Sequence, residues 1–101
     1  MVYCIDIDGT LCSIEKEYID SVGFPERIEA VNELYYSGNI IILWTGRHWN
    51  NLEMTVEQLN GWGVKYHSLI MGKPPADVYI DDKAVDDVSF FDIPLPGAAK
   101  V

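Results

Sequence analysis

Four aspartates stand in two tight pairs, and each pair directly follows a short apolar segment. They are Asp6 with Asp8, after residues 2–5, and Asp81 with Asp82, after residues 77–80. Carboxylates at close quarters repel one another unless they are protonated or bridged by a cation. A hard divalent ion with oxygen ligands, most simply Mg²⁺, resolves this repulsion and usually shares its coordination with phosphate oxygens. Mn²⁺ accepts the same ligands, so the residues leave the choice of ion open.

A hydroxyl group and an amine accompany these carboxylates in the sequence. Thr45 and Gly46 follow the long apolar segment 39–44, and Lys73 stands just before the segment 77–80. A lysine ammonium beside carboxylates can offset the charge of a bound phosphate and of an attacking nucleophile. These residue types together indicate phosphate chemistry assisted by a cation, provided that the fold brings them to one place.

Four apolar segments predict the strands that must position these groups. Runs rich in Ile and Val without polar alternation are typical of strands buried on both faces, as in a parallel sheet. The first two runs are strong, the third is weaker and the fourth is short. They are residues 2–5, 39–44, 64–71 and 77–80.

Helices are expected between and after these strands, because apolar residues recur there at helical spacing and glycines follow. The predicted helices are residues 25–37, closed by Gly38, residues 51–60, closed by Gly61, and a short helix within 84–91. Asn50 and Glu53 have the spacing of a capping box at the start of the second helix.

The alternation of strands and helices predicts an α/β fold, a three-layer Rossmann-like parallel sheet with right-handed crossovers and the strand order 3-2-1-4. Ligands of such open sheets bind outside the carboxyl ends of the strands. The polar residues that follow the strands should therefore converge on one edge. Residues 9–24 and 92–101 show no strong pattern, and the second of these segments is expected to form a loop-like tail.

Length and charge restrict the class of protein. The 101 residues allow a single domain, 1–101, and sixteen acidic against seven basic residues give a net charge of −9. This charge disfavours binding to nucleic acids or to anionic membrane surfaces. We expect no membrane span and no signal peptide, since no apolar run approaches about 20 residues and the first residues lack a basic segment. Two cysteines without a C-x-x-C pair favour a reduced, cytoplasmic setting.

Four short motifs, in this order, resemble those of the haloacid dehalogenase-like (HAD) hydrolases. They are Asp6–Leu11, Trp44–Arg47, Gly72–Asp77 and Tyr79–Asp82. The resemblance extends from residue 2 to about residue 85. One such motif is moderately specific, whereas four on the expected strand ends are strong evidence for the family.

The resemblance implies a role for each polar residue near the strand ends. Asp6 would be the nucleophile that forms an aspartyl-phosphate, and Asp8 would protonate the leaving oxygen and then activate water. Thr45 and the backbone N–H of Gly46 would hold the phosphoryl oxygens, and Lys73 would stabilise charge. An acid two residues after the nucleophile indicates a phosphatase rather than a dehalogenase or a transport ATPase.

The resemblance also implies a metal site and a substrate-facing segment. Asp6, the backbone carbonyl of Asp8 and the acids Asp81 and Asp82 would hold Mg²⁺, with Asp81 slightly favoured over Asp82 as the direct ligand. Two residues that follow the phosphate-binding motif either contact the substrate or are displayed on the surface. These residues are Arg47 and His48.

The short segments between the motifs leave no room for a cap domain. Residues 9–24 can form only the small squiggle and flap of the family, so the chain resembles a minimal, capless member. The runs 62–67 and 72–83 are similar to those of small phosphatase-like proteins of capsule and surface-polysaccharide biosynthesis, which implies a sugar phosphate as substrate. An open site would need a neighbouring subunit or a bulky substrate to exclude water.

Two other functions remain open at this stage. One is a 5′- or 3′-nucleotidase or polynucleotide phosphatase, although the acidic charge argues against a polynucleotide. The other is a catalytically silent module that keeps the fold for interaction. The presence of Asp6, Asp8, Thr45, Lys73 and Asp81 argues against the silent module, because such a protein would need none of them.

Overall fold

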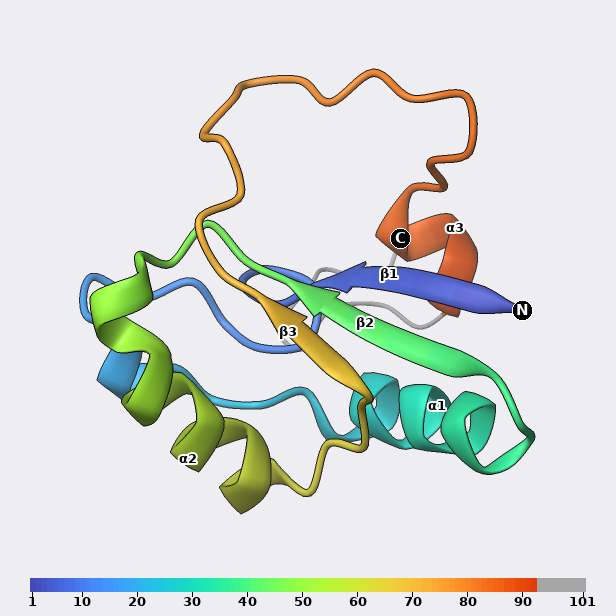
Figure 1. Ribbon diagram of the computed structural model, residues 1–101, viewed down its shortest axis with the longest axis horizontal. Helices are drawn as coiled ribbons and strands as arrows, with labels where there is room; N and C mark the ends of the chain where they lie inside the picture. Colours follow the sequence, from blue (N-terminus) through green and yellow to red (C-terminus); the bar gives the residue numbers. More distant parts are fainter. Residues whose placement is uncertain (93–101) are drawn as a thin grey trace, which may run out of the picture.

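The structure, a computed structural model, describes residues 1–92. Its sheet has three parallel strands in the order β1-β2-β3, which confirms the 3-2-1 part of the predicted order (Figure 1). The strands are β1 (Val2–Asp6), β2 (Ile40–Trp44) and β3 (Ser68–Ile70). Asp6 pairs with Trp44, and Trp44 pairs with Ile70. The carboxyl ends of all three strands therefore meet at one edge of the sheet.

One face of the sheet carries the hydrophobic core. Ile41 and Leu43 alternate along β2 and so point to the same face, where both are fully buried. The helices are α1 (Pro25–Tyr36), α2 (Leu52–Trp62) and the short α3 (Asp87–Phe91). Each contributes to the same apolar cluster, through Ile28 and Val31 of α1, Leu59 of α2 and Phe91 of α3. These helices thus cover a single face of the sheet.

The structure confirms the predicted α/β fold with a Rossmann-like parallel sheet, and its second face is less covered than its first. In the described part of the chain, Cys4 is exposed and Ile42 and Trp44 are only half-buried on that face. A second helical layer needs a crossover connection of about a dozen residues. The connection 71–86 after β3 is long enough for this, but none of its residues is helical.

The predicted fourth strand is also not formed. Residues 77–80 have no strand pairing, and Val78 and Ile80 are exposed. Figure 1 shows the segment 72–86, coloured orange, extending away from the sheet before the chain returns at α3. The prediction was wrong because three apolar residues in sequence do not by themselves provide a partner strand.

Several element boundaries differ from the prediction. β3 is shorter than the predicted 64–71. α2 continues past Gly61 to Trp62 and is followed by Gly63, whose φ of 74° is the left-handed conformation found after a helix C-terminus. The predicted capping box is not formed. Instead, the His48 ring nitrogen Nδ1 accepts from the Asn50 N–H at 3.2 Å, at the start of the 3-10 helix η2 (Trp49–Asn51).

Two further sequence expectations concern the membrane and the tail. No helix among residues 1–92 combines the length and the apolar character needed to cross a bilayer. The predicted loop-like tail, 92–101, lies outside the described residues except for Asp92.

Candidate active site

Asp6 and Asp8 lie on either side of a buried residue at the carboxyl end of β1. Ile7 is fully buried, and its carbonyl accepts hydrogen bonds from the N–H groups of three residues, 10–12. The chain therefore turns sharply after Asp8. Gly9 has a φ of 81°, and a Cβ there would lie 2.9 Å from Ile14 Cδ1, so the turn requires glycine.

The Asp6 carboxylate has a cation and a hydroxyl beside it. Lys73 Nζ lies 3.6 Å from Asp6 Oδ1, and Thr10 Oγ1 donates to Asp6 Oδ2 at 3.4 Å. Burial raises the pKa of the Asp6 carboxyl, and the charge of Lys73 opposes that rise without cancelling it. The folded protein thus holds this carboxylate at an energetic cost that a further cation would relieve.

Lys73 is held by aromatic rings and by the backbone that follows β2. Its Nζ lies 5.0 Å from the centre of the Trp44 ring and 4.1 Å from that of Tyr79. Its backbone N–H donates to the Thr45 carbonyl at 2.8 Å. Only 13% of its side chain is exposed, so the ammonium is directed to Asp6 rather than to solvent. The structure therefore joins Lys73 to Asp6, as the sequence predicts.

The Asp8 carboxylate faces β2 and is bound there by two side chains. Thr45 Oγ1 donates to Asp8 Oδ2 at 3.2 Å. Arg47 Nη2 donates to Asp8 Oδ1 at 2.9 Å, and Arg47 Nε donates to Asp8 Oδ2 at 3.1 Å. Cys12 Sγ lies 3.6 Å from Asp8 Oδ1 and donates to it. Burial, with a contribution from the Asp8 charge, raises the pKa of the Cys12 thiol to about 12, so it remains a neutral donor.

The two residues expected either at the substrate or on the surface lie in different surroundings. His48 is exposed and its ring accepts the Asn50 N–H. Arg47 is buried, with 1% of its side chain exposed, and contacts Asp8 instead of solvent. Surface display of Arg47 is therefore wrong, because the guanidinium finds its partners inside the protein.

The predicted phosphate-binding residues are at the same edge. Thr45 is fully buried, and its Oγ1 also accepts the Arg47 N–H at 3.1 Å. Gly46 is exposed beside it, and a Cβ at Gly46 would lie 3.6 Å from the Lys73 carbonyl. The structure thus brings together Asp6, Asp8, Thr45, Gly46 and Lys73.

Asp81 and Asp82 are not brought to this group. Both are exposed in the segment 72–86, and Asp81 Oδ1 accepts the Lys83 N–H at 2.8 Å. That hydrogen bond lowers the pKa of the Asp81 carboxyl. Among residues 1–92 no three side chains of His, Cys, Asp or Glu are grouped so as to hold a metal ion.

The sequence interpretation missed a set of polar side chains behind Asp8. They are Tyr18 of the 3-10 helix η1 (Tyr18–Asp20) and Thr55 and Gln58 of α2, all of which contact Arg47. The available signal was weak. Thr55 and Gln58 are one helical turn apart on a helix whose apolar side faces the core, and nothing in the sequence couples them to Arg47.

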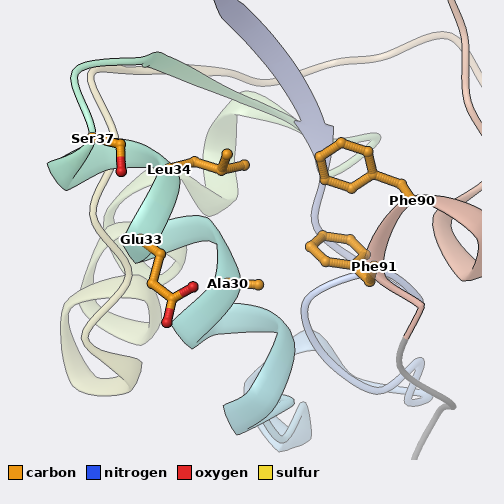
Figure 2. A pocket seen from close by; sticks show the side chains of 6 residues that line it. All are labelled: Ala30, Glu33, Leu34, Ser37, Phe90 and Phe91. Carbon is orange, nitrogen blue, oxygen red and sulfur yellow. The ribbon is translucent and has the colours of Figure 1, made fainter.

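The pocket in Figure 2 lies elsewhere in the molecule. It is an open hollow of about 320 Å³ between α1 and α3, and none of the site residues lines it. Its lining residues are Ala30, Glu33, Leu34, Ser37, Phe90 and Phe91.

Comparisons with solved structures agree with the fold. A structural-genomics protein from Vibrio cholerae superposes with a TM-score of 0.79 and 26% identity, over 93% of this chain and 89% of that one. A chain of the Pnkp1/Rnl/Hen1 complex has a TM-score of 0.63 and 22% identity, over 80% of this chain and 30% of that one. D,D-heptose 1,7-bisphosphate phosphatase from B. bronchiseptica, complexed with magnesium and phosphate, has a TM-score of 0.56 and 15% identity, over 75% and 52% respectively.

Sequence comparison gives the family. No curated protein matches the chain. Residues 3–71, which include β1, β2, β3 and both long helices, match the model of the haloacid dehalogenase-like hydrolases. This match covers more than half of the chain and contains Asp6, Asp8 and Thr45. The chain therefore belongs to the haloacid dehalogenase-like hydrolase family.

Proposed function

We propose that this protein is a phosphatase that hydrolyses phosphate monoesters, with Asp6 as the nucleophile. The observation that carries the proposal is the pairing of Asp6 with Lys73 at the carboxyl edge of the sheet, 3.6 Å apart. A carboxylate can attack phosphorus only where a positive charge offsets the repulsion between two anions. Lys73 provides that charge.

The reaction proceeds in two steps on this chain's own residues. An Asp6 carboxylate oxygen forms a bond to phosphorus while the ester P–O bond breaks, and Asp8 donates a proton to the departing alkoxide. This leaves an acyl phosphate on Asp6. Asp8 then takes a proton from water, whose oxygen attacks phosphorus and releases Asp6 and inorganic phosphate. Gly46 and Thr45 would hold the phosphoryl oxygens, the Thr45 hydroxyl turning its proton from Asp8 to the substrate.

The donor set is suited to Mg²⁺. This ion requires only one or two carboxylates when substrate phosphate oxygens and waters complete its coordination. The raised pKa of Asp6 shows a carboxylate that burial disfavours and that a cation would favour. Asp6 and the backbone carbonyl of Asp8 would hold the ion, and Asp81 and Asp82, which are exposed and apart from Asp6, would join them only after a rearrangement of the segment 72–86. When bound, Mg²⁺ would neutralise charge on the transferring phosphoryl group.

A small sugar phosphate is the proposed substrate. Three lines of support are the likeness of the run 72–83 to polysaccharide-biosynthesis phosphatases, the heptose bisphosphate phosphatase among the neighbours of the fold, and the net charge of −9. That charge disfavours a polynucleotide as substrate, which is the alternative suggested by the Pnkp1/Rnl/Hen1 RNA repair complex among the structural neighbours. A panel of sugar phosphates, nucleoside 5′- and 3′-monophosphates and a 3′-phosphorylated oligonucleotide distinguishes the two.

The nucleophile is tested with p-nitrophenyl phosphate and MgCl₂. We expect turnover by the wild type and a loss of at least about 10³-fold in Asp6→Asn, since removing a nucleophile removes the covalent route. Asp20→Asn is the matched control, because it makes the same chemical change at an exposed aspartate of η1. Equal rates in the wild type and Asp6→Asn would refute the mechanism.

The metal ligands are tested by magnesium titration of the activity. We expect Asp81→Asn to raise the Mg²⁺ concentration for half-maximal rate by about 10-fold or more, and Asp82→Asn to have a smaller effect. Asp77→Asn, an exposed aspartate of the same segment, is the control. If neither Asp81→Asn nor Asp82→Asn differs from the control, these acids do not hold the ion.

A further inference from the structure

The buried Arg47 guanidinium uses its donors on a fixed set of partners. Its Nε and Nη2 form the fork that binds both Asp8 oxygens, at 3.1 and 2.9 Å. Its Nη1 donates to Thr55 Oγ1 at 3.1 Å and to Gln58 Oε1 at 2.5 Å. The guanidinium carbon lies 4.7 Å from the centre of the Tyr18 ring. Both ends of the guanidinium are thus held, one by the site and the other by α2.

The partners of Arg47 are themselves joined. Gln58 Nε2 donates to the Tyr18 carbonyl at 2.6 Å, so α2 and η1 are bound to one another on the side of Arg47 away from Asp8. The Arg47 backbone is fixed as well, since its N–H donates to Thr45 Oγ1 and its carbonyl accepts from the Gly72 N–H at 2.9 Å. The guanidinium therefore has little freedom to turn toward a substrate.

A carboxylate bound through both oxygens by a planar fork has one orientation. Lysine cannot reproduce this, because an ammonium is a point charge that leaves the carboxylate free to rotate about its own axis. Proton transfer depends on that orientation, since a small misplacement of the donor reduces the rate severely. The contacts of Arg47 thus fix the orientation of the Asp8 carboxyl, and the proposed proton transfer by Asp8 depends on that orientation.

We propose that Arg47 is a positioning residue that orients Asp8 for proton transfer to the leaving group and makes no contact with the substrate. The proposal rests on the proposed phosphatase function. α2 and η1 serve as its support, through Thr55, Gln58 and Tyr18. This assigns a catalytic purpose to side chains of α2, which lies behind the strand edge.

The first test is the dependence of kcat/KM on the leaving group. kcat/KM reports the steps up to departure of the leaving group, where a proton donor is needed most by poor leaving groups. We expect Arg47→Ala to lose about 10²-fold for an alkyl phosphate and less than about 10-fold for p-nitrophenyl phosphate, with phenyl phosphate between them. Arg47→Lys should lose nearly as much activity as Arg47→Ala, since lysine keeps the charge but not the planar fork.

The second test is a double-mutant cycle with the proton donor itself. Asp8→Asn removes the group that Arg47 is proposed to orient. In that background, Arg47→Ala should reduce kcat/KM for the alkyl phosphate by less than about 3-fold, because nothing remains to position. Independent roles would instead give losses that multiply.

A milder variant keeps the proposal testable if Arg47→Ala fails to fold. Gln58→Met removes one partner of Arg47 Nη1 and leaves the Asp8 pair in place. We expect a smaller loss with the same steeper dependence on the leaving group. Circular dichroism and thermal unfolding of each variant show that the comparison is made between folded proteins.

Several outcomes would overturn the proposal. A rise in KM that is equal for all leaving groups would mean that Arg47 contacts the phosphoryl group. Multiplying losses in the double mutant would mean that Arg47 acts apart from Asp8. If the wild type hydrolyses none of the phosphates, the proposed function fails first and this inference fails with it. If the wild type is active and the Arg47 variants have the same leaving-group dependence as the wild type, the proposed role of Arg47 is refuted while the proposed function stands.

Discussion

Two regions of this protein have comparable motifs but differ in burial. The residues that follow β1 and β2 are packed inside the protein, whereas most residues that follow β3 are exposed. Thr45 and Arg47, which follow β2, are buried and bound to Asp8. Asp81 and Ile80, in the segment that follows β3, are exposed, and 95% of Ile80 is accessible to solvent. Both regions consist of polar residues placed after an apolar run.

The difference arises from what each region has to pair with. After β1 the chain makes a tight turn in which the carbonyl of buried Ile7 accepts hydrogen bonds from three backbone N–H groups. Because β1 pairs with β2, the motif after β1 lies beside the motif after β2. The segment 72–86 does not pair with a strand, and Gly72, Lys73 and Tyr79 are the residues through which it contacts the site. A motif is thus placed by the elements on both sides of it rather than by its own sequence.

The largest predicted change in the free energy of unfolding is for a substitution in the core beneath β2. Leu43→Ala removes a fully buried side chain of β2 from the core cluster. We expect a loss of about 3 kcal/mol in the free energy of unfolding, from lost burial and the cavity that remains. Urea denaturation followed by circular dichroism measures this loss. A loss below about 1 kcal/mol would mean that the β2 core is not packed as described.

The next largest change in the free energy of unfolding is expected at the start of α3, where the chain returns to the core after the exposed segment 72–86. Asp87 Oδ2 lies 2.6 Å from Nη1 of buried Arg27, which also donates to the Thr10 carbonyl. Asp87→Ala removes this carboxylate from a buried cation, and we expect a loss of about 1–2 kcal/mol, less than for a fully buried pair because Asp87 is partly exposed. Urea denaturation again measures it, with Asp77→Ala as the exposed control. Equal stabilities of the two variants would contradict the anchoring of α3 through Arg27.

A smaller effect concerns the pH dependence of stability at Asp6. Burial raises the pKa of Asp6 in the folded protein above 3.8, the ordinary value, which the unfolded chain retains. The stability that its proton contributes is therefore complete below pH 3.8 and is lost as the pH rises through the folded pKa. In EDTA at pH 7, Asp6→Asn should be more stable than the wild type, by less than about 1 kcal/mol because the group is partly exposed.

Thermal unfolding at two pH values checks this sign. The advantage of Asp6→Asn should shrink as the pH is lowered through the raised pKa of the folded carboxyl toward 3.8. MgCl₂ at pH 7 should also reduce it, since the ion stabilises only the carboxylate. An advantage that is independent of pH would show that burial of the Asp6 charge is not its cause.

The smallest predicted effect is in the exposed segment. Ile80→Ala should change the free energy of unfolding by less than about 0.5 kcal/mol, because a side chain that is already in water loses little on truncation. The measurement is repeated with and without MgCl₂ and compared with Leu43→Ala. A loss of about 2 kcal/mol in both conditions would mean that Ile80 is buried, and the contrast between the two regions would disappear.

Local patterns predicted much of the fold. Pro25 at the start and Gly38 past the end marked α1 to within a residue, and the Ile-rich run 39–44 marked β2. Such patterns are reliable because helix ends and buried strands depend on neighbouring residues. The same patterns wrongly predicted a fourth strand and a second helical layer, since each of these depends on a partner distant in the chain.

The same distinction between local patterns and distant partners applies to the candidate site. The types and spacing of Asp6, Asp8, Thr45 and Lys73 were enough to predict that they share one edge, because parallel strands must align their carboxyl ends. The orientation of Arg47 could not be predicted, because its partners on α2 become neighbours only when that helix packs on the sheet. Sequence alone therefore determined which chemical groups this protein has and, except for Asp81 and Asp82, on which edge they stand. The tertiary structure alone decided which of them touch, since contacts between distant residues are set by packing and not by spacing along the chain.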